Sequence, residues 1–151
     1  MRIFHAIFFS LLLSACLTMP GPDTTPTADS PFVTVQEENP YSPKPEDLGK
    51  QQASVIVTSV DLSERSDLSP VRVEVSIFGS MPSVCNELRV TVDPPTAAYE
   101  VHIEAYSVAD PNQNCENVFQ QFEGHILLGV YTPGRYTIWV NDTFVGDMIS
   151  N

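Results

Sequence analysis

The stretch Val71–Ile77, with the sequence VRVEVSI, indicates the fold class of this chain most directly. Apolar side chains occupy every second position, and charged or polar side chains lie between them. Because successive side chains of a β-strand point to opposite faces of a sheet, this alternation predicts a strand with one buried and one solvated face. Strands of this kind are typical of antiparallel sheets.

The same two-residue period recurs along the C-terminal two thirds of the chain. Six further segments show it, at residues 54–61, 88–93, 99–106, 118–130, 136–141 and 143–149. Pro, Gly, Asn and Asp punctuate the connections, and Asn141-Asp142 suits a two-residue hairpin turn. No stretch of about twelve residues has a helical apolar stripe. About seven strands within about 100 residues predict an all-β domain over residues 51–151, built as a two-sheet sandwich.

The segment Tyr131–Asn141, YTPGRYTIWVN, followed by Thr143 and Phe144, resembles the last hairpin of immunoglobulin-like bacterial sandwich domains. Together with Cys85 and Cys115, it makes residues 54–149 similar to small exported lipoprotein domains of unknown function. The resemblance implies a small Ig-like antiparallel β-sandwich of about seven strands and implies no activity. An antibody-type domain is disfavoured, because there the two cysteines bracket the buried Trp, whereas Trp139 lies beyond both cysteines here.

Residues 1–15 have the features of a secretory signal peptide. Arg2 precedes an apolar run, Ile3–Leu13, which is shorter than the about 20 residues needed to span a bilayer. The tetrapeptide Leu13–Cys16, LSAC, resembles the lipobox of bacterial lipoproteins. The resemblance implies cleavage before Cys16, a diacylglyceryl group on its thiol, and acylation of the new amino terminus by a chain such as palmitate. The alternative is a conventional signal peptide with an incidental cysteine.

An acylated Cys16 makes the lipid bilayer the first expected partner. Two or more acyl chains hold a protein stably at a membrane, whereas one chain gives marginal attachment. We therefore expect a location in the cell envelope. The outer membrane is favoured if the host has two membranes, because Leu17 is not an aspartate retention signal. Otherwise the expected location is the outer face of the cytoplasmic membrane.

Residues 16–50 predict a lipidated cysteine followed by a disordered Pro-rich linker. Seven of the 13 prolines lie between Leu17 and Lys50, mostly among Thr, Ser, Asp and Glu. Proline removes hydrogen-bond donors, and so few apolar side chains cannot build a core. An extended tether is the expectation. For the short run Phe32–Val35, the alternative is pairing with an edge of the folded domain.

The chain is strongly acidic, with 19 Asp and Glu against 7 Lys and Arg and a formal net charge of −12. A surface of this charge repels nucleic acid and anionic lipid headgroups and keeps the protein soluble. The composition therefore argues against a nucleic-acid partner.

The chain has three cysteines, and a lipidated Cys16 leaves Cys85 and Cys115. In an oxidising compartment an even remainder predicts one disulfide, and the alternative is two free thiols. A Cys85 nucleophile paired with His102 or His125 would be incompatible with this disulfide. Because no motif of a known catalytic class is present, we expect no enzyme and no cofactor.

Metal binding is a weak alternative that depends on how two strands are placed. One strand carries alternating polar residues at Glu100, His102 and Glu104, and another carries Glu123 and His125. If these strands were neighbours, their imidazoles and carboxylates could converge on a divalent ion. Solvated polar faces explain the same pattern, so the sequence predicts no metal site.

Trp139 is the first candidate contact for a protein or glycan partner, with Tyr106 as the second. Alternation places Trp139 on the outer face of its strand, and exposed aromatics dominate binding hot spots. The interpretation that the sequence favours is nevertheless a Trp that lies across its own sheet against a neighbour such as Tyr106. We expect a binding module. The alternatives are an inhibitor of exported proteases, inserting Gly79–Val84 or Asp110–Asn117, and a structural envelope protein.

Overall fold

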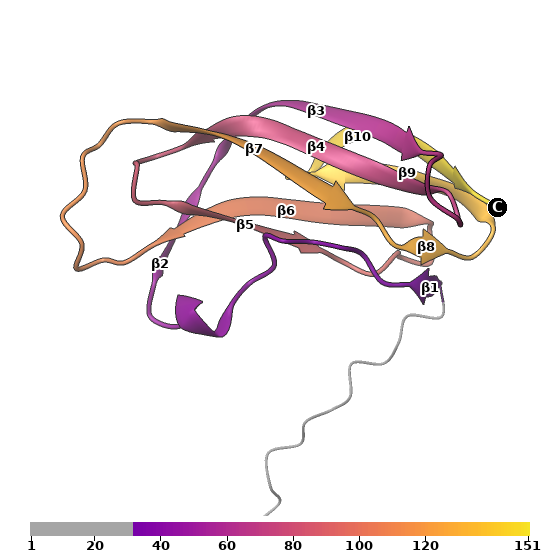
Figure 1. Cartoon of the computed structure of the whole chain (residues 1–151), viewed down its shortest axis with the longest axis horizontal. Coiled ribbons are helices and arrows are strands. Elements are labelled where there is room, and N and C mark those ends of the chain that lie inside the picture. The colour runs from indigo at the N-terminus through magenta and orange to yellow at the C-terminus, as the bar shows by residue number, and fades with distance from the viewer. Residues whose placement is uncertain (1–31) are drawn as a thin grey trace, which may run out of the picture.

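The computed structural model describes residues 32–151, so the signal peptide, Cys16 and the first part of the predicted linker lie outside the described residues. The elements in chain order are β1 (Val33–Val35), the 3-10 turn η1 (Pro45–Asp47), β2 (Gln51–Ser54), β3 (Ile56–Arg65), β4 (Arg72–Met81), β5 (Glu87–Val92), β6 (Glu100–Ala109), β7 (Gln120–Leu127), β8 (Val130–Tyr131), β9 (Gly134–Val140) and β10 (Thr143–Ser150) (Figure 1). Within this part of the chain, no helix has the length and apolarity to cross a membrane.

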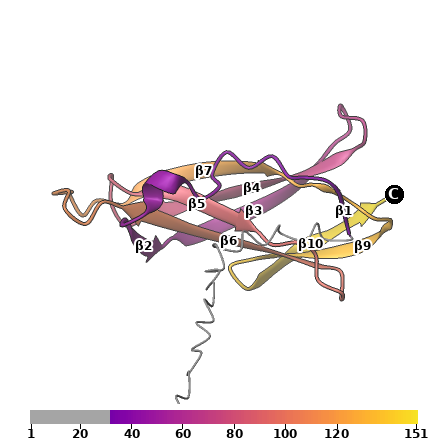
Figure 2. The ribbon, with the colours of Figure 1, turned by 90° about the horizontal axis from the view of Figure 1, so that it is seen from below.

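Two sheets pack face to face, which confirms the predicted β-sandwich (Figure 2). One sheet has the order β3-β4-β7, and the other contains β10-β9-β6, with β5 along one edge of β6 and β2 along the other. Pairing is antiparallel throughout except between β6 and β9, which run parallel over Glu100–Ile103. Both β9 and β2 therefore pair with one edge of β6, at opposite ends of it.

Alternating apolar side chains from the two sheets form a single core. Val75 and Ile77 of β4 are fully buried, and Val101 of β6 and Ile138 of β9 meet them from the other sheet. The predicted strand 54–61 is interrupted at Val55, where the chain leaves the sheet of β2 and enters that of β3. Burying the Val55 side chain at this crossover keeps the apolar pattern continuous although the hydrogen-bonding partner changes.

The predicted disorder of residues 16–50 is wrong for the part of that segment that the structure describes. β1 pairs with β8, and Glu38 exchanges backbone hydrogen bonds of 2.8 and 3.1 Å with Leu127. Further along, the Val90 amide donates to the Tyr41 carbonyl at 2.9 Å, and the Asn39 side chain donates to the Val90 carbonyl at 2.7 Å. The segment thus connects the edge of β7 with the edge of β5. Exposed sheet edges supply partners to the residues between the prolines, which composition alone does not reveal.

Candidate binding site

Three aromatic side chains lie side by side on the outer face of the larger sheet. Phe144 of β10 is in register with Trp139 of β9, and Trp139 is in register with His102 of β6. The ring centroids of Phe144 and Trp139 are 5.6 Å apart in an edge-to-face arrangement. Those of Trp139 and His102 are 6.1 Å apart with nearly parallel planes. Phe144 is 50% exposed, so this set, called here the aromatic row, is open to solvent.

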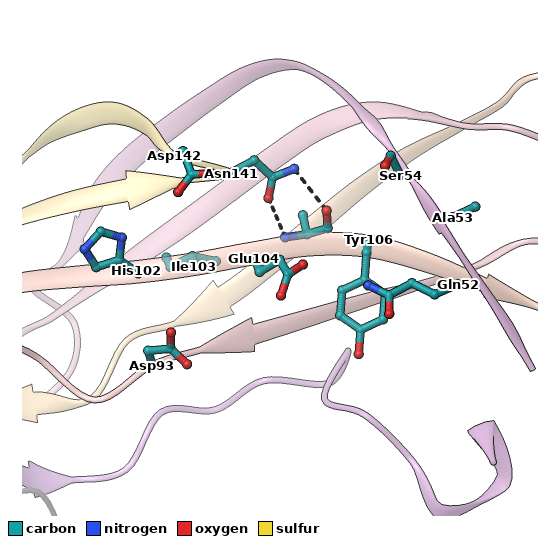
Figure 3. A pocket seen from close by; sticks show the side chains of 11 residues that line it. Gln52, Ala53, Ser54, Asp93, His102, Ile103, Glu104, Tyr106, Asn141 and Asp142 are labelled. Carbon is teal, nitrogen blue, oxygen red and sulfur yellow. Dashed lines mark hydrogen bonds between the residues drawn. The ribbon is translucent and has the colours of Figure 1, made fainter.

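A groove of about 670 Å³ adjoins the aromatic row along β6 (Figure 3). It forms because β2 and β9 pair with opposite ends of the same edge of β6. The side chain of His102 belongs to both the row and the groove. Carboxylates supply much of the remaining polar lining, from Asp93, Glu104 and Asp142. None of these three forms an ion pair within residues 32–151.

Asn141 completes the backbone bonding of β6 between its two strand partners. Its side-chain oxygen accepts from the Ala105 amide at 2.7 Å, and its side-chain nitrogen donates to the Ala105 carbonyl at 3.0 Å (Figure 3). Asn141 and Asp142 have φ values of 45° and 62° and form the two-residue turn between β9 and β10. The turn expected at these residues is confirmed, and it places Asp142 at the rim of the groove.

At the other end of this sheet face, cationic groups are already paired with carboxylates of the same chain. The Arg89 guanidinium, only 3% exposed, donates to both Asp47 oxygens at 2.6 Å and to Glu87 at 2.7 Å. The Arg89 guanidinium thereby holds the pKa of the Asp47 carboxyl well below its usual range. Lys50 bonds Glu87 at 2.7 Å, and this contact lowers the pKa of Glu87.

Tyr106, the second candidate contact, lies between this ion-pair cluster and the groove, and Arg89 is its cross-strand neighbour. Burial, followed by the nearby Glu104 carboxylate, raises the pKa of the Tyr106 hydroxyl. Its phenol ring therefore stays neutral and forms part of the groove wall. Trp139 points outward, as alternation predicts, but its ring packs against His102 and Phe144.

The two histidine-bearing strands do not converge. His102 lies on the outer face of the larger sheet, whereas His125 of β7 lies on the outer face of the smaller one. His125 is 2.9 Å from the Ser76 hydroxyl and 3.1 Å from Glu123. In the described part of the chain, no three His, Cys, Asp or Glu side chains are grouped as metal ligands.

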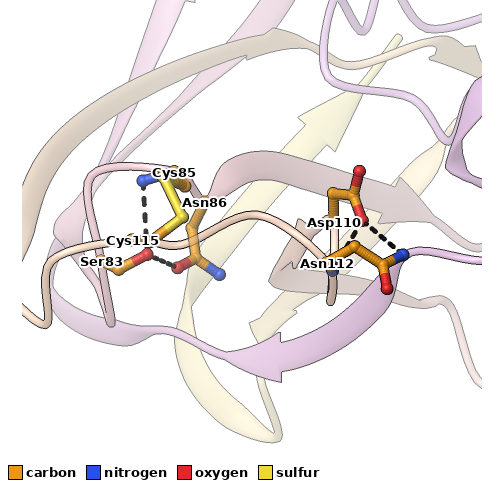
Figure 4. Close-up of a disulfide and its surroundings, with 6 residues drawn as sticks. All are labelled: Ser83, Cys85, Asn86, Asp110, Asn112 and Cys115. Atoms are coloured by element: carbon orange, nitrogen blue, oxygen red, sulfur yellow. Dashed lines mark hydrogen bonds between the residues drawn. A yellow bond between two sulfur atoms is a disulfide. The ribbon is translucent and has the colours of Figure 1, made fainter.

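A disulfide joins Cys85 and Cys115, as the sequence predicts (Figure 4). It ties the β4–β5 connection to the long exposed loop between β6 and β7. At the base of that loop, Val118 and Phe119 are 54% and 63% exposed. Gly79–Val84 is not an exposed loop as a whole, because residues 79–81 belong to β4 and are buried in the sheet.

Phe144 and Asn141 are functional-site candidates that the sequence pattern alone did not single out. The signal for Phe144 was present, because a two-residue turn at 141–142 pairs Thr143 with Val140 and Phe144 with Trp139. The contact between Trp139 and His102 had no such signal, since the two residues are 37 positions apart (139 − 102) and β7 of the smaller sheet lies between their strands in the chain.

The fold and the exposed surface define a small β-sandwich domain with an aromatic and acidic outer face. Residues 75–149, from the middle of β4 into β10, match the family model of the ORF11 beta-sandwich domain. The matched segment contains the aromatic row, Glu104, Asp142 and both disulfide cysteines, and it leaves out β1, β2 and β3. No curated protein and no solved structure matches the chain.

Proposed function

We propose that this protein is a lipid-anchored, extracytoplasmic binding module that holds its partner on the aromatic row and the adjoining groove. The LSAC sequence supports acylation at Cys16 and a position in the cell envelope. The observation that carries the binding role is the aromatic row itself. Exposed aromatic side chains that lie in contact with one another mark interaction surfaces more often than scattered exposed apolar residues do.

The aromatic row is not needed to hold the two sheets together. The core lies on the other side of the larger sheet, where Ile138 and Val140 of β9 are buried. Trp139 and Phe144 point away from it and remain partly solvated. Covering them with a partner removes apolar surface from water at about 25 cal/mol per Å².

Inhibition of exported proteases is the second candidate function, and the disulfide-tied loop supports it. Asp110–Asn117 is exposed almost throughout, and the Asn112 amide donates to the Asp110 carboxylate at 2.8 Å (Figure 4). A loop restrained at Cys115 loses less conformational entropy on entering a cleft than a free loop does. Val118 and Phe119 at its base offer apolar contacts.

Photo-crosslinking in the native host distinguishes the two surfaces. We would replace Phe144 in one variant and Phe119 in another by p-benzoylphenylalanine, which conserves an aromatic ring at each site. The binding-module proposal predicts a discrete adduct from position 144 and none from position 119. An adduct from position 119 alone would favour the inhibitor, and unchanged activity of the captured protease with excess domain would then reject it. Adducts from neither position would favour a structural envelope protein.

The anchor is tested separately by the intact mass of the membrane-extracted protein. We expect a mass that fits cleavage before Cys16 plus a diacylglyceryl group and acyl chains. A Cys16→Ser variant should leave the membrane fraction while its domain stays folded. An unlipidated mass for the unaltered protein would overturn the proposed location and leave the binding surface to be judged on the crosslinks.

A further inference from the structure

We propose that the ligand of this surface is a cationic segment of a partner protein, with an arginine or lysine side chain against Trp139 and its charge beside Glu104 and Asp93. This inference rests on the proposed function, because it names the chemistry of the ligand for the same surface.

The sheet geometry places two carboxylates beside His102, at one end of the aromatic row. Glu104 follows His102 by two residues on β6 and therefore projects from the same face. Asp93, directly after β5, lies across from His102 on the neighbouring strand, because the Asp93 amide donates to the His102 carbonyl at 2.9 Å. A guanidinium or ammonium group on the face of a Trp ring is attracted by the ring electrons within about 6 Å of its centroid. Glu104 and Asp93 flank His102, which stacks on Trp139, so we expect a long cationic side chain on this face to lie near both the ring and the carboxylates.

The groove carboxylates have no counterion from their own chain among residues 32–151. Every arginine there already binds other carboxylates, in the pairs Arg65 with Asp67 and Glu74, Arg72 with Glu38, Arg89 with Asp47 and Glu87, and Arg135 with Asp147. Lys50 likewise binds Asp47 and Glu87. These cations are therefore not available to the groove carboxylates, and a cationic ligand would supply the complementary charge.

The charge of the whole protein favours the same class of ligand. A net charge of −12 attracts a cationic segment during diffusional encounter and repels an anionic one. A neutral glycan can stack on Trp139 but leaves Glu104 and Asp93 without positive charge. Arginine suits the surface particularly well, since its planar group stacks on aromatic rings and bonds carboxylates at its edge.

Trp139 is the only tryptophan of the chain, so its fluorescence reports on this surface alone. We would titrate the full chain, in detergent, with a hexa-arginine amide and follow the emission at near-physiological salt. We expect a saturable change that weakens as salt is added. The double variant Glu104→Gln/Asp93→Asn should raise the Kd at least tenfold.

A matched double variant, Asp61→Asn/Glu64→Gln, controls for net charge. Both residues are exposed on β3 of the other sheet and form no ion pair among the described residues, and the charge change is identical. We expect its Kd to change less than twofold. Equal losses in the two double variants would show general attraction to an acidic protein and would overturn the proposal.

Two further outcomes separate this inference from the proposed function. A saturable Trp139 response to an N-acetylglucosamine tetramer, with none to the peptide, would replace the cationic ligand by a glycan. A discrete crosslink at position 144 combined with no response to hexa-arginine would keep the binding module and reject the cationic segment. Circular dichroism of every variant, compared with the unaltered protein, confirms that a lost response reflects the site and not the fold.

Discussion

The outer faces of the two sheets are built from the same alternating pattern and both carry ion pairs, but they differ in what lies beside their unpaired carboxylates. On the smaller sheet, Glu74 bonds Arg65 at 2.9 Å, and His125 lies within 3.1 Å of Glu123. On the larger sheet, Glu104 has no ion-pair partner in the described chain and lies beside the aromatic row. A solvated sheet face becomes a candidate binding site where carboxylates without an ion-pair partner lie beside exposed aromatic rings.

Both faces depend on one core, so the largest expected effect comes from a change that acts on both. Replacing Ile77, which is fully buried in β4, by Ala should lower the free energy of unfolding by about 2–5 kcal/mol. The matched variant Ile56→Ala, at a 55% exposed position of β3, should cost about 0.5 kcal/mol or less. Urea denaturation checks both values. Equal effects would contradict the assignment of Ile77 to the shared core.

Removing the disulfide tests whether the loop between β6 and β7 influences the outer face of the larger sheet. The double variant Cys85→Ser/Cys115→Ser should lose about 3 kcal/mol of stability, because a loop of 30 residues is no longer closed in the unfolded chain. Trp139 emission of the folded variant should stay unchanged. A shifted emission maximum under native conditions would show that the loop and the aromatic row are coupled.

Two variants in the turn between β9 and β10 distinguish the effect of backbone strain on stability from the effect of hydrogen bonding. Asp142→Gly should stabilise the fold by up to about 1 kcal/mol, since glycine adopts a φ of 62° without strain. Asn141→Gly relieves similar strain at a φ of 45° but leaves the Ala105 amide and carbonyl unpaired, for a net loss of about 1–2 kcal/mol. Thermal unfolding of the two variants should therefore shift in opposite directions.

The smallest expected effect on stability concerns the ion pair of Arg89 and Asp47, at one end of the larger sheet's outer face. Arg89 depresses the pKa of folded Asp47, whose ordinary value is 3.8. The folded state therefore binds this proton less readily than the unfolded state does, and the pair stabilises the fold above about pH 4. This contribution is lost as the pH falls from there toward the depressed value.

Asp47→Asn should consequently lower the urea midpoint at pH 7 and lower it less at pH 3. The control Asp61→Asn, on the smaller sheet, should show no such dependence, because Asp61 has no ion-pair partner in the part of the chain described. A constant difference between Asp47→Asn and the unaltered protein across this range would contradict a stabilising role for the ionised pair.

The strands and the core were predictable because period-two alternation reflects burial directly. Val75, Val101 and Ile138 could each be assigned to the inner face without knowing which strands are neighbours. The order of strands was not predictable, because alternation is the same whichever partner a strand has. This explains why the crossover at Val55 and the parallel pairing of β6 with β9 were missed.

The candidate site was predictable only in part, for the same reason. Trp139 was assigned to the outer face from its own strand, and the disulfide followed from the cysteine count together with the lipobox resemblance. The neighbours of Trp139 could not be predicted, since His102 lies beside it only because β6 pairs with β9. The ordered segment before β2 was also missed, because its bonds are made to edges that exist only in the folded domain.

The sequence was sufficient to predict the all-β class, the inward and outward faces of the clearly alternating strands such as Val71–Ile77, the acidic charge and the turn at Asn141-Asp142. These properties depend on residues close together in the chain. Tertiary structure alone decided that Phe144, Trp139 and His102 form one row, that Asn141 completes the edge of β6, and that Asp47 covers Arg89. Those contacts arise between distant segments, where strand pairing and the geometry of the two sheets determine which side chains meet.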